Sequence, residues 1–189
     1  MIHPPPLRAC AIGCALAAAI GLALPGTAQA CTAREPTRQT WPGPHDFSTA
    51  PGENRLWRDG DAGEPLFLHL RILDTCGEPI ANARVRILHA DHHGAHHRDR
   101  WRAHLDADAR GVLEVLTVYP GYAGEMPRHI HFIITHPGYR ELVTRLFFKN
   151  DPATAGGGLD ELTVVTEEVR RGEQTRWVAG FEFVLARER

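Results

Sequence analysis

Two histidines, His129 and His131, lie one residue apart inside the apolar run HIHFIIT. In a β-strand, residues i and i+2 point to the same face, so the two imidazoles stand side by side, about 6 to 7 Å apart at Cα. That spacing suits chelation of one metal ion and turns Ile130 and Phe132 toward a core. The alternative is a pair of solvated histidines on the wetted face of an edge strand. A buried imidazole without a partner costs free energy. Whether the pair binds a metal or is solvated therefore depends on whether the sequence offers further ligand candidates.

A second group of histidines precedes this pair in the segment HADHHGAHHRD. Asp91 and Gly94 predict a turn in the middle of that segment. Most of its histidines fit a polar surface loop, but one or two can reach across to the pair. The group consists of His89, His92, His93, His96 and His97.

Two tyrosines, Tyr119 and Tyr122, come shortly before the pair in the segment TVYPGYAGEMP. Imidazole and carboxylate ligands suit Fe, Cu or Zn. A phenolate ligand would favour a ferric ion, which is a hard Lewis acid. The alternatives are a partly buried aromatic at a strand end for Tyr119 and an exposed turn residue for Tyr122.

The elements that must position these side chains are short strands. In LFLHLRIL, leucines and an isoleucine alternate with Phe67, His69 and Arg71, which predicts one buried face and one exposed face. Gly, Pro, Asn or Asp separate this run from the next ones, and no long stretch has a helical period. The pattern predicts an antiparallel β-sandwich at 65–189 behind an irregular arm at 31–64. The other runs are ARVRILHA, GVLEVLTV, HIHFIIT, LVTRLFF, ELTVV and RWVAGFEFVL.

Residues 1–30 are typical of a secretory signal peptide. They contain one early basic residue, Arg8, then an apolar run, and they end in the small-x-small motif Ala28-Gln29-Ala30. The run is short for a membrane span, and no other segment is long enough to be one. We therefore expect export to the periplasm or the cell exterior. A lipid anchor on Cys31 ranks second, because Ala28 replaces the leucine usual in that signal.

Cleavage after residue 30 leaves two cysteines, Cys31 and Cys76. In an oxidising compartment they predict one disulfide, which would pin the proline-rich arm across the sandwich. Two free thiols are the alternative.

Composition excludes some classes of partner. The 189 residues are 43% hydrophobic with a formal net charge of -2, which is ordinary for one globular domain and gives no electrostatic case for nucleic acid or an anionic membrane. The chain has no nucleophile elbow, phosphate-binding loop or dinucleotide fingerprint.

Three segments, in order, resemble the intradiol ring-cleavage dioxygenases, the protocatechuate and catechol dioxygenase family. PRHIHFIITHPGYRELVTRLFF is similar to the family pattern R-P-x-H-I-H-F, then P-G-Y, then L-x-T-Q-L-Y-F. GEPIANARVRILHADHHGAHH resembles G-x-P-I-x-G-A-x-V-x-I-W-H-A-D-x-x-G-x-Y, and CTAREPTRQTWPGPHDF resembles C-x-x-T-P-x-Q-T-E-G-P-F. The resemblance covers most of the mature chain, matches the short exported branch in length, and implies the family's β-sandwich.

The resemblance also implies a ligand set. The family holds a non-haem Fe(III) with two tyrosines and two histidines, and the histidines carry over to His129 and His131. The tyrosine positions fall on His96 and on Ala123, one place after Tyr122. We therefore name His129, His131, His96 and Tyr122 as candidate ligands, with Fe(III) first. A three-histidine site would admit Cu or Zn.

Two arginines stand at or near further functional positions of the family. The family arginine falls on Met126, close to Arg128, and the family glutamine falls on Arg145. The resemblance implies Arg128 and Arg145 as candidate catalytic residues.

Two hypotheses follow. The first is an enzyme that inserts O2 into a catechol-like aromatic diol at a non-haem metal. The second is a binding module on the same fold that has lost ring cleavage and binds a metal or another ligand through its histidines. A homo-oligomer is compatible with either.

Overall fold

The computed structural model describes residues 31–41, 50, 52–154, 157–172 and 174–188. The predicted signal peptide lies outside these residues. Within them, no helix is long and apolar enough to cross a membrane. The only helices in this part of the chain are two short 3-10 helices, η1 (Pro152–Thr154) and η2 (Asp160–Leu162), which lie between Phe148 and Thr163.

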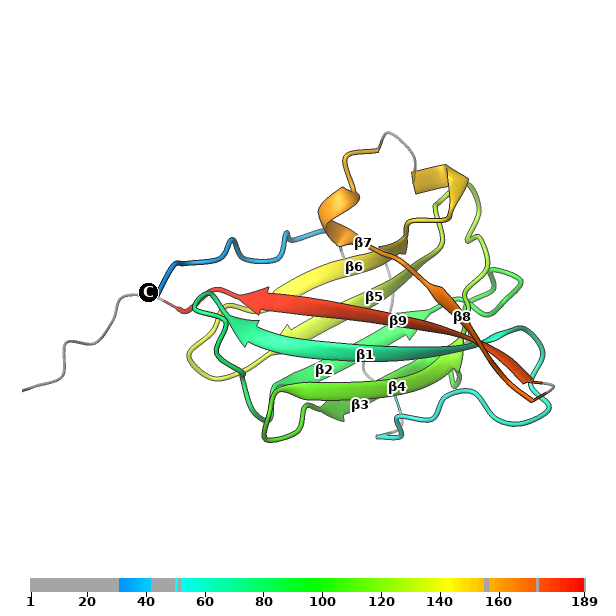
Figure 1. The fold of residues 1–189 in the computed structure, drawn as a ribbon, viewed down its shortest axis with the longest axis horizontal. Helices are drawn as coiled ribbons and strands as arrows, with labels where there is room; N and C mark the ends of the chain where they lie inside the picture. The colour runs from blue at the N-terminus through cyan, green and yellow to red at the C-terminus, as the bar shows by residue number, and fades with distance from the viewer. Residues whose placement is uncertain (1–30, 42–49, 51, 155–156, 173, 189) are drawn as a thin grey trace, which may run out of the picture. The chain divides into compact units, whose positions relative to one another are not determined.

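The strands form two sheets, which Figure 1 shows stacked as the layers of a sandwich. Sheet A has the order β4-β1-β9-β8, and sheet B has the order β3-β2-β5-β6-β7. The strands of sheet A are β1 (Pro65–Asp74), β4 (Val112–Val118), β8 (Glu167–Arg171) and β9 (Gln174–Leu185). The strands of sheet B are β2 (Arg84–His89), β3 (Arg102–Asp106), β5 (His129–Thr135), β6 (Leu142–Phe148) and β7 (Thr163–Val164).

The all-β class predicted from the alternating runs is confirmed. Most neighbouring strands are antiparallel, as predicted, but β1 pairs in parallel with β9, and β6 with β7. The chain crosses from sheet B before it forms the β8–β9 hairpin, so no tight turn sets the direction of β9 relative to β1. The two sheets are therefore mixed.

The core lies between the inner faces of the sheets. Leu66, Leu68 and Leu70 of β1 are fully buried and belong to the same cluster as Ile130 and Phe132 of β5. Each such side chain contributes about 1.5 to 3 kcal/mol relative to an exposed position. Because alternate residues of a strand face opposite ways, the histidine pair of β5 faces the outer side of sheet B.

The N-terminal arm joins both sheets. Cys31 and Cys76 form a disulfide with their Cα atoms 5.4 Å apart, which confirms the predicted bond. Further along, Thr37 donates its N–H to a carbonyl of β9 at 2.9 Å, and Thr40 donates its N–H to a carbonyl of β6 at 2.8 Å. The arm thus passes from sheet A to sheet B and reaches the strand next to the histidine pair.

Candidate functional site

The histidine pair lies at the start of β5, on the outer face of sheet B. Strand β5 is central, between β2 and β6, so the edge-strand alternative is wrong. His129 is 7% exposed and His131 is 3% exposed. Their Nε2 atoms are 3.0 Å apart, and their rings are nearly perpendicular at 76°. The two imidazoles therefore converge in a buried position.

The geometry of the pair fits two ligands of one metal ion. His129 Nδ1 lies 2.6 Å from the carbonyl oxygen of Pro127, which can only accept, so Nδ1 carries the proton and Nε2 of a neutral ring keeps its lone pair. Two metal–nitrogen bonds of about 2.1 Å at a right angle place their nitrogens about 3.0 Å apart. A carbonyl partner on the remote nitrogen is the usual support of a metal-binding histidine. The same 3.0 Å also suits an N–H···N hydrogen bond between the two rings.

His96 lies beside the pair, with its ring centroid 6.4 Å from that of His131. Two glycines let the loop that precedes His96 pack closely on the segment around Tyr122. Gly94 has φ +89°, and a side chain there would collide with the Tyr122 carbonyl, while Gly121 has no room for one either. The residues that the structure describes contain no group of three or more His, Cys, Asp or Glu side chains arranged to hold a metal ion. A third-ligand role for His96 stays a prediction.

Other histidines of the loop segment make structural hydrogen bonds. His89 is fully buried, with Nδ1 2.7 Å from the Ala90 carbonyl and Nε2 2.7 Å from the Thr117 hydroxyl. Burial lowers the pKa of His89 to about 4, so the ring is neutral at pH 7. His97 contacts Asp91 at 2.7 Å. Partial burial by itself raises the pKa of Asp91, but hydrogen bonds from His97 and from two backbone N–H groups lower this pKa to about 2.

The hydroxyl of Tyr122 is engaged by a buried carboxylate. It donates to Asp151 Oδ1 at 2.9 Å, and Asp151, only 4% exposed, also accepts the backbone N–H groups of Arg128 and Ala153. Burial by itself raises the pKa of Asp151, but these donors hold it below its ordinary value. The hydrogen bond to Asp151 raises the pKa of Tyr122 and keeps it a neutral phenol. Ligation through Tyr122 would require this bond to break, and its ligand role stays a prediction.

Arg128 lies against two aromatic rings next to the histidine pair. Its Cζ is 4.6 Å from the ring centroid of Tyr122 and 5.5 Å from that of Tyr119. The Tyr119 ring packs on Phe148 at 4.7 Å, and burial raises the pKa of Tyr119. These contacts hold the Arg128 guanidinium against the two tyrosine rings.

Sequence reasoning missed Asp151. An Asp-Pro dipeptide after a strand predicts a turn, and it does begin η1. Nothing in the local pattern indicates that this carboxylate contacts a tyrosine 29 positions earlier.

Strand β6 adds two side chains to the same face. Arg145 stands directly opposite His131, and Phe147 stands opposite His129 with ring centroids 5.8 Å apart. Arg145 is half-buried, and its Nε donates to the Thr40 hydroxyl at 3.4 Å. Burial lowers the pKa of Arg145. The structure thus gathers the predicted site residues around the start of β5: His96, Tyr122, Arg128, His129, His131 and Arg145.

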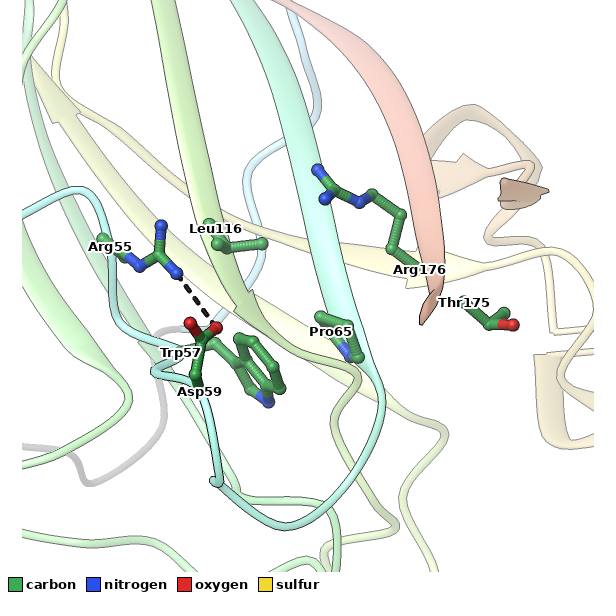
Figure 2. A pocket seen from close by; sticks show the side chains of 7 residues that line it. All are labelled: Arg55, Trp57, Asp59, Pro65, Leu116, Thr175 and Arg176. Atoms are coloured by element: carbon green, nitrogen blue, oxygen red, sulfur yellow. Dashed lines mark hydrogen bonds and ion pairs between the residues drawn. The ribbon is translucent and has the colours of Figure 1, made fainter. Parts of the chain in front are cut away.

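A pocket of about 360 Å³ lies elsewhere, on the outer side of sheet A. Figure 2 shows Arg55 joined to Asp59 at 3.2 Å, near Leu116 of β4 and Pro65 of β1. None of the predicted site residues lines this pocket, so this pocket does not mark the candidate site. Its lining consists of Arg55, Trp57, Asp59, Pro65, Leu116, Thr175 and Arg176.

Known proteins share both this fold and parts of this sequence. The dioxygenase domain of a dioxygenase carbohydrate-binding protein fusion from Streptomyces sp. SirexAA-E superposes with a TM-score of 0.72 at 25% identity, covering 82% of this chain and all of that domain. Catechol 1,2-dioxygenase 2 of Acinetobacter lwoffii is 30% identical over 177 residues, covering 75% of this chain. Hydroxyquinol 1,2-dioxygenase of Rhodococcus opacus is 30% identical over 122 residues, covering 52% of this chain. No family model matches the sequence.

The sandwich is the fold of the solved intradiol dioxygenases. With the sequence relatives, it supports membership of this chain in the intradiol ring-cleavage dioxygenase family. The chain spans 64% of the length of the Acinetobacter relative and 41% of the Rhodococcus relative.

Proposed function

We propose that this protein is an exported intradiol-type dioxygenase that acts on a catechol-like aromatic diol at a non-haem metal held by His129 and His131. The relatives are named for reactions of catechol and hydroxyquinol, which supports an aromatic diol and O2 as the substrates. In the balanced reaction one O2 is consumed and the bond between the two hydroxyl-bearing carbons breaks. In the product, each of those carbons is part of a carboxyl group.

The observation that carries this proposal is the buried pair of Nε2 atoms 3.0 Å apart on the outer face of sheet B. Fe(III) is the first choice of metal, as in the family, and Cu or Zn is the choice if His96 supplies a third imidazole. When bound, the metal would supply Lewis-acid binding of the two diol oxygens and activation of the diol toward O2.

The protein's own residues prepare the site for an anionic diol. Arg145 stands opposite His131, and its positive charge favours loss of the diol protons, while Arg128 adds a second positive charge from the residue before His129. The carboxylate of Asp151 accepts hydrogen bonds from the Tyr122 hydroxyl and from backbone N–H groups. Phe147 is fully buried and packs 5.8 Å from His129, which holds that imidazole ring in place.

Export is supported by two features of the chain. The N-terminal 30 residues have the pattern of a signal peptide, and Cys31 and Cys76 form the disulfide expected outside the cytosol. We place the mature protein in the periplasm or outside the cell.

Metal content and oxygen consumption test the proposal together. The mature protein is purified, its metals are quantified, and O2 uptake is followed with catechol and with hydroxyquinol after loading with iron, copper or zinc in parallel. We expect uptake of one O2 per diol with iron, formation of a dicarboxylic acid identified by mass spectrometry, and normal uptake in the control His69→Gln, which alters an exposed histidine of sheet A. Full iron loading without O2 uptake on either diol would reject ring cleavage in favour of a binding module.

A further inference from the structure

The pocket of about 360 Å³ on the outer side of sheet A is separate from the candidate site, which lies on the outer face of the other sheet. Its volume falls within the range of pockets that hold small molecules. Figure 2 shows Arg55 and Arg176 on opposite sides of it, with Trp57, Pro65 and Leu116 between them. These three residues are each half-buried. The pocket therefore has an apolar middle and a guanidinium on each side.

The wall that carries Trp57 is held in place by hydrogen bonds within the protein. The backbone N–H groups of Leu56 and Trp57 both donate to the carbonyl oxygen of Leu116, at 2.7 and 3.1 Å. Further along the same segment, Asp61 accepts a hydrogen bond from the Arg100 guanidinium at 2.6 Å. A wall that is already ordered lowers the entropic cost of binding a ligand against it.

The two arginines of the pocket differ in how their charge is balanced. Arg55 is exposed and donates to Asp59 Oδ1 at 3.2 Å. Arg176 is half-buried, and within the part of the chain that the structure describes no carboxylate forms an ion pair with it. Elsewhere on the same face, Arg71 pairs with Glu182 at 2.7 Å. Of the charged groups that line the pocket, two are thus positive and one is negative, and the unbalanced charge is that of Arg176.

We propose that this pocket is a second binding site, independent of the histidine pair, for a single ring that carries a carboxylate. The carboxylate pairs with Arg176, because a guanidinium holds both carboxylate oxygens through two parallel hydrogen bonds. The ring packs on Trp57, Pro65 and Leu116, which are the apolar part of the lining. A volume near the lower end of the usual range suits one ring and not several. Aromatic acids and sugar acids share this chemistry.

Calorimetry with benzoate and with glucuronate tests the site in the full mature chain. We expect at least one of these acids to bind and Arg176→Gln to weaken that binding about 10-fold, the usual effect of losing a hydrogen bond to a charged group. The matched control is Arg58→Gln, which alters an exposed arginine that pairs with Glu53 at 3.5 Å and does not line the pocket. Binding of benzoate alone assigns an aromatic acid, and binding of glucuronate alone assigns a sugar acid. Binding of neither acid, or equal binding by Arg176→Gln, would overturn the proposal.

Asp59→Asn separates attraction of an anion from hydrogen bonding to a neutral ligand. Its side chain is 78% exposed, so we expect the variant to fold normally. The substitution removes the negative charge from the pocket and frees Arg55, so the acid should bind about 2- to 5-fold more tightly, the range expected from an exposed ion pair. Weaker binding in this variant would show that Asp59 itself holds the ligand and would reject the assignment of an anion.

Two further variants locate the bound acid. Trp57→Phe keeps an aromatic ring, so calorimetric binding should remain while the change in tryptophan fluorescence on binding is lost. A fluorescence change that persists in this variant would place the acid elsewhere. His131→Gln should bind the acid as the natural protein does, and loss of binding there would assign the acid to the histidine pair instead. Because binding is measured without turnover, failure of this proposal and failure of ring cleavage are read separately.

Discussion

The outer faces of the two sheets both carry histidine and arginine side chains, but these differ in solvent exposure and in ion pairing. On sheet A, Glu182 pairs with Arg34 at 2.9 Å and with Arg71 at 2.7 Å, and His69 pairs with Glu114 at 3.3 Å. All of these side chains are well exposed to solvent. On sheet B, His131 is 3% exposed and Arg145 has no carboxylate partner in the described part of the chain.

The difference separates charged groups that are solvated from polar groups that are shielded from solvent. Exposed pairs are solvated and contribute little, typically 0 to about 1 kcal/mol. Buried imidazoles and a desolvated guanidinium are costly to keep, and such groups gather at functional sites. Of the two arginines that line the pocket of Figure 2, Arg55 is exposed and already pairs with Asp59.

Removing the disulfide should have the largest effect, because the arm it tethers is bonded to both sheets. Replacing Cys31 and Cys76 with serine should lower the free energy of unfolding by about 4 kcal/mol, the chain-entropy estimate for a loop of this length. The melting temperature should fall by about 10 °C for a domain of this size. Thermal and denaturant unfolding of the oxidised protein and the double variant measures this. A loss below about 1 kcal/mol would mean that hydrogen bonds alone hold the arm.

The pH dependence of stability should come from a buried histidine, His89, and not from the exposed histidine His69. The folded pKa of His89 is about 4, below the value of about 6.5 in an unfolded chain, so the unfolded state takes up the proton more readily. The stabilisation is complete above pH 6.5 and is lost as the pH falls toward 4, in total about 3 kcal/mol. We expect His89→Gln to flatten the slope of unfolding free energy between pH 7 and pH 4.5. His69→Gln is the control, and an equal slope in all three proteins would contradict the prediction.

Metal affinity should depend on a histidine of sheet B, His131, and not on a histidine of sheet A, His69. Losing a hydrogen bond that supports a ligand already costs about 10- to 100-fold in metal affinity, so His131→Gln, which removes the candidate ligand itself, should cost more than about 100-fold. His69→Gln removes a histidine from the exposed face and should leave affinity unchanged. Competition titration with a chelator of known affinity measures both. Stoichiometric, tight metal binding by His131→Gln would place the metal elsewhere.

The smallest effect is expected on the outer face of sheet A. Glu182→Gln breaks two exposed ion pairs and should change the free energy of unfolding by less than about 1 kcal/mol, with the change shrinking at high salt. Denaturant unfolding at low and high ionic strength measures it. A loss above about 2 kcal/mol would show that exposure alone does not separate the two faces.

Local alternation in the sequence was enough to determine which strand residues face the core. Leu66, Leu68 and Leu70 are buried as predicted, and the i, i+2 spacing placed His129 and His131 on one face. The cysteine count, read with the signal peptide, predicted the disulfide. These features depend on a two-residue period or on a simple count, and both are visible without knowing the fold.

Only the tertiary structure decided which strands pair and what surrounds the histidines. The segments Arg102–Asp106 and Glu167–Arg171 are too charged to show a strand pattern, and they become strands because β2 and β9 offer them backbone partners. Asp151 meets Tyr122, and Arg145 meets His131, across distances along the chain that no local pattern spans. Burial, hydrogen-bond partners and the lack of a counter-ion are properties of neighbours in space, so the chemistry of this site could be predicted in residue type but not in charge state or contact.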